Sequence, residues 1–424
     1  MLPQRYGIMY LEATIFKEIH FMKKILLLAI ILTVLVCGCT NKGSHNNVVQ
    51  PPEPPQKENM DPLQKQIEMM SIDEKIGQLV MVGLDGYEID EAALDMIHKY
   101  KVGGFVLFKR NVQSAQQVIA LINSLKEANR ASHVPLFIAV DEEGGRVSRM
   151  PDEFLKLPAS RSIGKVNSEE FAFEVGSVIG EAIRALGFNM NFAPVLDIDS
   201  NPKNPVIGDR SFGQDPEIVS SLGGAFMKGL QSHLISTIKH FPGHGDTSVD
   251  SHVGLPVINH PIDRLKSFEL VPFAKAIESG ADAVMIAHIL LPEIDELNPA
   301  SFSKAVISDI LREEMKFDGL VITDDMTMGA IVENFDIGEA AVKSLQAGAD
   351  IILVCHDHQK QIKVLEALKQ AAADGALDES LLDQHVYRVL RLKQRYELKD
   401  EAIEGVDVDA INEKIRGLLD KYYN

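Results

Sequence analysis

The most informative part of this chain is an apolar segment, Leu234-Ile235-Ser236-Thr237-Ile238, that runs into Lys239-His240-Phe241-Pro242-Gly243-His244-Gly245-Asp246-Thr247-Ser248-Val249-Asp250-Ser251-His252. The first segment predicts a buried β-strand. Pro242 and the two glycines exclude a helix after it, so we expect a loop at the strand's carboxyl end. This loop holds three His, two Asp and one Lys, which is too polar for a buried turn. The pattern indicates a catalytic loop.

Similar apolar segments recur along residues 76–355, and the sequence between them has helical periodicity. The expected strands are Ile76–Gly83, Gly104–Phe108, Pro135–Val140, Asn189–Leu196, Leu234–Ile238, Asp282–Ala287, Gly319–Thr323 and Asp350–Val354. The expected helices include Ala115–Ala128, Phe171–Leu186 and Phe268–Ser279. Strand–helix alternation requires parallel pairing with right-handed crossovers. The repetition predicts an α/β protein with a (β/α)8 barrel of TIM type, and a doubly wound open sheet is the alternative.

Polar residues at the strand ends favour the barrel. Active sites of (β/α)8 barrels gather at the carboxyl ends of the strands. The residues at those ends are Asp141, Asp197, Lys239, His240, His288, Asp324 and Asp325. An open sheet would not need polar residues at nearly every strand end, so the barrel is the preferred interpretation.

The composition limits the classes of partner. A net charge of −19 argues against nucleic acid, whose phosphates require a basic surface. It favours a neutral or small ligand. Tryptophan is absent, so a sugar-stacking surface would have to use Phe, Tyr or apolar side chains. The three cysteines offer neither a disulfide framework nor CxxC metal spacing, and Cys355 is expected to be a small buried hydrophobe.

The N-terminal region has the order of features of a bacterial lipoprotein leader. Met22-Lys23-Lys24 precedes a twelve-residue segment that is apolar except for Thr33, and Val36-Cys37-Gly38-Cys39 then resembles a lipobox. We expect residues 1–21 to be a non-native extension, residues 22–38 to be the signal peptide, and Cys39 to be diacylated after cleavage. The protein would then be lipid-anchored on the extracellular face of the cell membrane. Ordinary secretion with incidental cysteines is the alternative.

Residues 39–61 are polar and centre on Pro51–Pro55, a composition that predicts a solvated tether. No second linker follows. We therefore expect residues 62–399 to form one catalytic barrel and residues 400–424 to add a helix or tail, without a C-terminal α/β sandwich domain.

Asp324 and Asp325 follow the seventh expected strand. Successive strand residues point to opposite sides, so we expect only one of them to face the barrel mouth. An ionised carboxylate there suits a nucleophile that attacks the anomeric carbon of a sugar. The alternative is that both residues cap the following helix, whose first turn would be Met326–Ala330, and this is the stronger interpretation for Asp325.

Asp250 and His252 are candidates for the proton donor of a glycosidase. That donor is usually a second carboxylic acid. A His paired with an Asp can replace it, because the imidazole supplies the proton while the Asp orients the ring and stabilises imidazolium. A loop that contains glycine could also bring the pair over bound substrate. A solvated loop with incidental charges is the alternative.

A metal site is a further alternative, since His240, His244, Asp246, Asp250 and His252 are all potential ligands. The His-x3-His spacing aligns two imidazoles only on a helix, which Pro242 and Gly243 exclude. We therefore expect no metal and no cofactor.

A second polar cluster, Asp141-Glu142-Glu143-Gly144-Gly145-Arg146-Val147-Ser148-Arg149, follows the third expected strand. A carboxylate there can bind two sugar hydroxyls, although a salt-bridged loop explains Glu142, Glu143 and Arg146 nearly as well. Arg210 lies in another turn-rich segment and would be weak evidence on its own.

Several of these motifs, taken together, resemble those of a known family. Lys239–His252 is similar to the KHFPGHG…DSH signature of glycoside hydrolase family 3 β-N-acetylglucosaminidases. Further matches are Asp141–Arg149, Gly208–Gly213, His288 and Val321–Met328, and the resemblance covers most of residues 65–395. It implies a retaining mechanism that removes terminal β-linked GlcNAc. It also implies Asp324 as nucleophile, Asp250 and His252 as the acid/base dyad, and sugar contacts from Asp141, Arg149, Arg210, Lys239 and His240.

The resemblance also narrows the type of family member. The family's β-glucosidases lack the Asp-Ser-His ending and take their acid from a second domain, so this chain resembles the one-domain members. The implied substrate is a peptidoglycan-derived saccharide, GlcNAc linked β-1,4 to MurNAc, with chitin oligosaccharides as the alternative. Phosphate could replace water as the acceptor of the sugar. A non-catalytic sugar-binding lipoprotein is the alternative in which the protein is not an enzyme. We expect a monomer.

Overall fold

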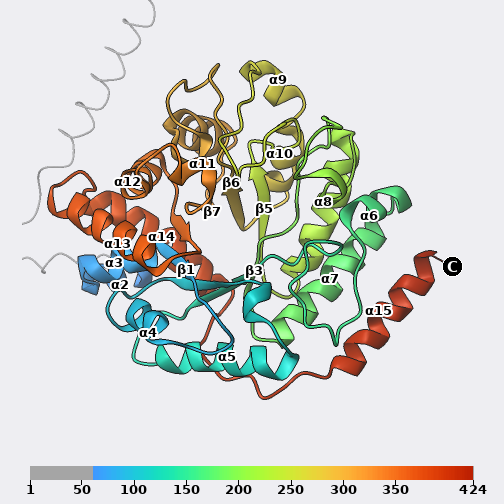
Figure 1. Ribbon diagram of the computed structural model, residues 1–424, viewed down its shortest axis with the longest axis horizontal. Helices are drawn as coiled ribbons and strands as arrows, with labels where there is room; N and C mark the ends of the chain where they lie inside the picture. Colours follow the sequence, from blue (N-terminus) through green and yellow to red (C-terminus); the bar gives the residue numbers. More distant parts are fainter. Residues whose placement is uncertain (1–60, 424) are drawn as a thin grey trace, which may run out of the picture. The chain divides into compact units, whose positions relative to one another are not determined.

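The structure is a computed structural model that describes residues 61–423. The expected extension, signal peptide, lipidated Cys39 and nearly all of the expected tether lie outside the described residues. Residues 61–423 belong to one compact unit. Its strands close into a barrel in the order β1-β2-β3-β4-β5-β6-β7-β8, and every neighbouring pair is parallel (Figure 1).

The barrel strands are β1 (Val80–Gly83), β2 (Gly104–Leu107), β3 (Phe137–Val140), β4 (Met190–Asn191), β5 (Ile235–Phe241), β6 (Ala283–Ile286), β7 (Leu320–Asp325) and β8 (Ile351–Val354). Closure is made by β1 and β8, with Val80 opposite Ile352. This pairing excludes the doubly wound open sheet and confirms the (β/α)8 barrel.

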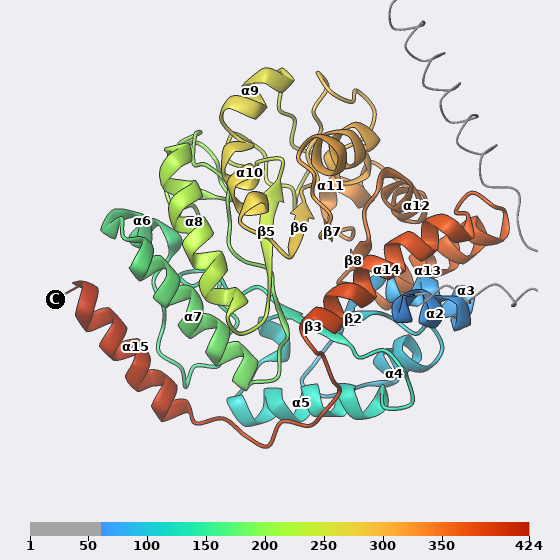
Figure 2. The same cartoon turned by 180° about the vertical axis from the view of Figure 1, so that it is seen from behind.

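Helices surround the strands in both views (Figures 1 and 2). They are α2 (Pro62–Met69), α3 (Ile72–Gln78), α4 (Glu91–His98), α5 (Ala115–Ala128), α6 (Ser160–Val166), α7 (Glu169–Ala185), α8 (Pro216–Gln231), α9 (Ile262–Ser267), α10 (Val271–Glu278), α11 (Gly329–Val332), α12 (Ile337–Ala347), α13 (His358–Ala373), α14 (Glu379–Arg395) and α15 (Val408–Tyr423). Shorter or irregular turns are the 3₁₀ helices η1 (Lys109–Asn111), η2 (Gly208–Arg210) and η3 (Ala300–Phe302), and the π-helix η4 (Ala305–Glu314).

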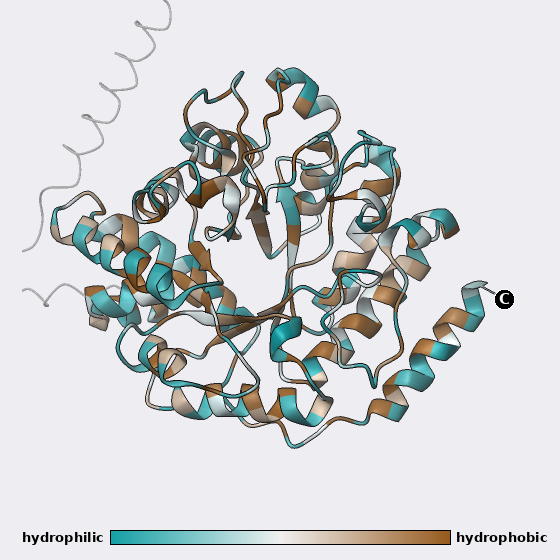
Figure 3. Ribbon diagram, viewed as in Figure 1, coloured by the Kyte–Doolittle hydropathy of each residue, from teal (hydrophilic) through white to brown (hydrophobic). Residues whose placement is uncertain are grey.

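The core lies in the barrel and between the strands and the helices. Nearly every strand residue is buried, and the strands are mostly apolar while the outward faces of the helices are mostly polar (Figure 3). Two-sided burial is what a parallel sheet covered by helices requires, and it explains the near-continuous apolar segments of the sequence. The predicted helix Ala115–Ala128 is confirmed, with Ser114 as its N-cap.

Two expected strands were too long. The segment Ile76–Gly83 becomes a strand only at Val80, because a capping box between Ser71 and Glu74 starts helix α3, which continues to Gln78. The segment Asn189–Leu196 contributes only the short strand β4, and the Ala193–Pro194 peptide bond that follows is cis. In the first segment the capped helix thus takes the place of the start of the expected strand.

Two other strands extend further than expected. Strand β5 continues through Lys239 and His240 to Phe241, and β7 continues through Asp324 and Asp325. The polar residues assigned to loops therefore stand on the last residues of buried strands. A site built on strands is held more rigidly than one built on loops.

The C-terminal segment ends in helix α15, which packs along α7 (Figures 1 and 2). Ile411, Ile415 and Leu418 form its buried face, and Lys421 pairs with Glu174 at 2.8 Å. Among residues 61–423 no helix is both long and apolar enough to cross a membrane.

Candidate active site

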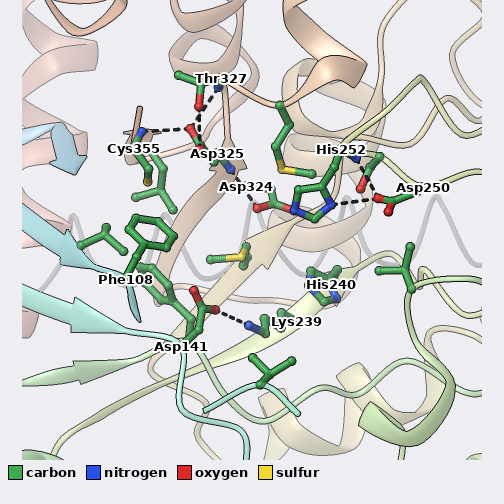
Figure 4. Close-up of a pocket in the computed structure, with 18 of the residues that line it drawn as sticks. Phe108, Asp141, Lys239, His240, Asp250, His252, Asp324, Asp325, Thr327 and Cys355 are labelled. Carbon is green, nitrogen blue, oxygen red and sulfur yellow. Dashed lines mark hydrogen bonds and ion pairs between the residues drawn. The ribbon is translucent and has the colours of Figure 1, made fainter. Parts of the chain in front are cut away.

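A cavity of about 500 Å³ opens at the carboxyl ends of the strands (Figure 4). All the residues predicted for catalysis and sugar binding line it, namely Asp141, Arg149, Arg210, Lys239, His240, Asp250, His252 and Asp324. They come from four barrel strands or the segments that follow them. The structure therefore brings together residues that are up to 183 positions apart, from Asp141 to Asp324.

Asp324 stands near the end of β7, and its Oδ1 accepts a hydrogen bond of 2.8 Å from the backbone N–H of Asp325. Burial alone would raise the pKa of Asp324. The attraction of His288 and His240, together with the Asp325 N–H and Lys239, outweighs that effect and holds the pKa below its ordinary value. The side chain is therefore a carboxylate near neutral pH, the form that a nucleophile needs.

Asp325 is also among the residues that line the cavity. The register of β7 against β8 shifts between Ile322 and Asp325, which breaks the alternation of side chains. Asp325 nevertheless serves a structural purpose. Its carboxylate accepts hydrogen bonds from the Thr327 hydroxyl at 2.6 Å, the Cys355 N–H at 2.9 Å and His356 Nδ1 at 2.8 Å.

The helix-capping alternative for the two aspartates was wrong in detail. Helix α11 begins only at Gly329, and Met328 occupies its N-cap position. Asp325 instead closes a turn by accepting from the N–H of Thr327 at 3.0 Å.

A cluster of two cations and two carboxylates forms the wall at β3 and β5. Lys239 Nζ contacts Asp141 Oδ1 at 2.6 Å and Glu143 Oε1 at 2.7 Å. Arg210 donates two hydrogen bonds of 2.8 Å to the carboxylate of Glu143. Burial would raise the pKa of Glu143, but Arg210 and Lys239 hold it well below its usual range. Glu143 thus fixes two of the predicted sugar-binding cations.

We expect Glu143→Gln to lower the free energy of unfolding by about 3–5 kcal/mol at neutral pH, since it leaves buried cations short of a partner. A carboxylate whose pKa is lowered on folding stabilises the protein above its unfolded pKa of about 4.3, and that contribution is lost as the pH falls below it. The difference from wild type should therefore shrink in denaturant titrations at a pH of about 3.

The neighbouring Glu142 offers a matched control. It is equally buried, but its carboxylate accepts from the backbone N–H of Arg149 at 2.7 Å, and burial raises its pKa to about 7. Glu142→Gln should change stability much less. Equal losses in the two variants at both pH values would contradict the assigned role of Glu143.

Asp197 organises the segment after β5. Its buried carboxylate accepts from His240 Nδ1 at 2.7 Å and from the backbone N–H of His244 at 2.6 Å. Burial would raise the pKa of Asp197, and His240 and His244 lower it overall. Arg210 Nη2 approaches the other ring nitrogen of His240 at 3.4 Å. His240 is thus oriented from both sides, and the Lys239–His240 peptide bond is cis.

Asp250 and His252 are hydrogen-bonded to each other. His252 Nδ1 donates to Asp250 Oδ1 at 2.8 Å, and the same oxygen accepts from the His252 backbone N–H at 2.9 Å. Burial would raise the pKa of Asp250, but these contacts lower it. With Nδ1 engaged, Nε2 of His252 is left for a substrate. Figure 4 shows the His252 ring and the Asp324 carboxylate directed into the same cavity.

Other predicted residues have more than one purpose. Arg149 lines the cavity and its backbone N–H holds Glu142. Arg146 pairs with Asp209 at 2.7 Å and donates to the carbonyl of Val206, as the salt-bridged alternative proposed.

The salt-bridged alternative for Glu143 agrees with its ion pairs to Arg210 and Lys239. The sequence interpretation did not predict that Asp197, His244 and Ser251 would hold neighbouring cavity residues in place. The imidazole of His244 has its pKa lowered to about 4 by burial, and it bonds Thr247 and Ser251. Position after a strand signalled Asp197, but its partners could not be read from the chain. In residues 61–423 no three His, Cys, Asp or Glu side chains converge in a way that would hold a metal ion.

Comparisons with known proteins identify the family of this chain. The model of the glycosyl hydrolase family 3 N-terminal domain matches residues 71–392. Beta-hexosaminidase A of Pseudoalteromonas piscicida is 36% identical over 326 residues, or 71% of this chain, which spans 54% of that relative. The beta-hexosaminidase of Idiomarina loihiensis is 36% identical over 293 residues, with 68% of this chain and 87% of the relative covered.

Among solved structures, a glycoside hydrolase family 3 β-N-acetylglucosaminidase from Paenibacillus sp. has 41% identity and a TM-score of 0.79. The match covers 83% of this chain and 69% of that chain. The chain therefore belongs to glycosyl hydrolase family 3, and within it to the enzymes of β-hexosaminidase type.

Proposed function

We propose that the protein is a retaining exo-β-N-acetylglucosaminidase that works through a covalent glycosyl intermediate on Asp324. The observation that carries this proposal is that a carboxylate at the end of β7 and an Asp–His pair on the loop after β5 line one cavity. The carboxylate has the ionised form required for attack, and the imidazole has a free nitrogen for proton transfer.

The mechanism has two half-reactions. Asp324 attacks the anomeric carbon while His252 donates a proton to the departing glycosidic oxygen, which yields the glycosyl-enzyme and the free aglycone. His252 then removes a proton from water, which attacks the same carbon and releases Asp324. Asp250 orients the ring and stabilises the imidazolium in both steps. Asp141, Arg149, Arg210, Lys239 and His240 supply donors and acceptors for the sugar hydroxyls.

The test is turnover of aryl β-GlcNAc beside aryl β-glucoside, with and without phosphate and with and without a chelator. We expect GlcNAc release that is faster than glucose release and insensitive to the chelator. Release of GlcNAc 1-phosphate in place of GlcNAc would identify a phosphorylase instead. Loss of activity on chelation would support a metal-dependent hydrolase, and sugar binding without turnover would support a binding protein.

We further propose a peptidoglycan-derived substrate, GlcNAc linked β-1,4 to MurNAc. The support is the expected lipid anchor, which would place the enzyme outside the membrane where cell-wall fragments occur. The disaccharide GlcNAc–MurNAc should be cleaved with a higher kcat/KM than chitobiose. A preference for chitobiose would point to chitin oligosaccharides.

Anchoring depends on Cys39 in this proposal. We expect Cys39→Ser to release active enzyme into the medium or to leave an uncleaved precursor, because one residue carries the lipid. Membrane fractionation and metabolic labelling with a fatty acid measure this. Cys37→Ser is the matched control and should leave the protein in the membrane fraction. A Cys39→Ser protein that still incorporates lipid would disprove the lipobox assignment.

A further inference from the structure

The position of His252 is set by more than its own side chain. The His252 side chain is 68% exposed, and within residues 61–423 its ring is hydrogen-bonded by Asp250 alone. Asp250 stands on the same loop and cannot fix that loop relative to Asp324. The distance between acid and nucleophile must therefore depend on the contacts that hold the backbone of this loop in place.

Ser251, between the two dyad residues, makes the first set of contacts that hold the loop. It is only 2% exposed, and its carbonyl accepts a hydrogen bond of 3.0 Å from the N–H of Ala330. Its hydroxyl is hydrogen-bonded to Nε2 of His244 at 3.2 Å. The loop is thus joined by its backbone to the start of α11, which follows the nucleophile strand.

Gly329 makes the second contact, with the backbone of the same loop. A Cβ at this position would lie 2.6 Å from the carbonyl oxygen of His252 and 3.2 Å from the carbonyl carbons of His252 and Val253. The backbone φ of Gly329 is not in the left-handed region, so the conformation itself does not demand glycine. Glycine is required because the loop that carries His252 approaches this position closely.

The same short segment holds the nucleophile. Gly329 follows Asp324 by five residues, and the turn between them is closed by Asp325, whose carbonyl accepts from the N–H of Met328 at 3.0 Å. Figure 4 shows the aspartates of β7 beside the dyad. We propose that Gly329 is a positioning residue: its missing side chain lets the dyad loop rest on the segment that carries Asp324, which fixes the acid relative to the nucleophile. This inference rests on the proposed role of His252.

The test is Gly329→Ala. We expect kcat for a GlcNAc disaccharide to fall about 100-fold, the order of effect of a displacement of about 1 Å at a reacting centre. With dinitrophenyl β-GlcNAc, whose leaving group needs little protonation, kcat/KM reports the glycosylation step and should fall less than about 5-fold. KM for the disaccharide should change little, because the sugar-binding residues stand on β5 or on the segments that follow β3 and β4.

Gly254→Ala is the matched control. Gly254 lies on the same loop two residues after His252, and a Cβ there would meet only Val249 Cγ1, at an ordinary 3.7 Å. The alanine restricts the loop backbone but does not force the loop away from Gly329. We expect kcat for the disaccharide to stay within about 3-fold of wild type, since no close contact arises.

A double-mutant cycle separates positioning from loss of structure. If Gly329 acts through His252, adding Gly329→Ala to His252→Ala should cause no further loss, whereas an independent folding defect would add to it. Full additivity, or equal losses of Gly329→Ala with both leaving groups, would overturn the inference. If His252→Ala itself shows no dependence on the leaving group, the proposed function fails instead, and the two failures are thereby distinguished.

Discussion

Replacing Asp324 by alanine is expected to reduce kcat by on the order of 10⁴-fold or more, because the variant has no group that can form the glycosyl intermediate. Sugar binding should persist, since Asp141, Lys239 and Arg210 are untouched. Hydrolysis of an aryl β-GlcNAc measures the first effect, and binding of GlcNAc by calorimetry measures the second. Thermal unfolding should show a folded protein.

The covalent step can be observed directly. A 2-acetamido-5-fluoro glycosyl fluoride should label the wild-type enzyme on Asp324, which peptide mass spectrometry can locate. Asp325→Asn is the matched variant, since it alters the adjacent carboxylate that holds Thr327 and the N–H of Cys355. It should still be labelled on Asp324, although more slowly. A label on Asp325 or elsewhere would overturn the assignment of the nucleophile.

The contrast between the two aspartates shows how far the sequence could lead. Alternation of strands and helices predicted the barrel, because each parallel strand must be followed by a crossover that covers it. The position of Asp324 after an apolar strand then predicted its place at the mouth. Asp325 could not be assigned in this way, since its orientation depends on a register shift against β8 that leaves no mark in the sequence.

Residues that act through others were the hardest to predict. Glu143 contacts Arg210 across 67 positions, and Asp197 contacts His240 across 43. Nothing near either residue in the chain identifies its partner. The dyad could be predicted because Asp250 and His252 are two positions apart and the contact is local. Contacts between residues close in the sequence can be predicted from it, whereas contacts that form only when the barrel closes cannot.

The dyad gives the second large effect. Departure of a sugar alkoxide needs a proton, so His252→Ala should lower kcat/KM for a GlcNAc disaccharide by about 10²–10⁴-fold. A dinitrophenyl leaving group needs little protonation and should be affected far less. Asp250→Ala should act in the same direction but more mildly, because His252 remains and loses only the partner at Nδ1. Rates over a series of aryl leaving groups measure this dependence.

Azide distinguishes the two half-reactions. With a good leaving group, the slow step of His252→Ala becomes the attack of water on the glycosyl-enzyme, which lacks its general base. Azide is already anionic and needs no base, so it should restore turnover and yield the β-glycosyl azide, whose configuration also reports retention. The exposed position of His252 leaves room for this small anion beside the cavity. Equal losses for activated and unactivated substrates, with no rescue, would show that the loop binds sugar or holds structure and that the proton donor lies elsewhere.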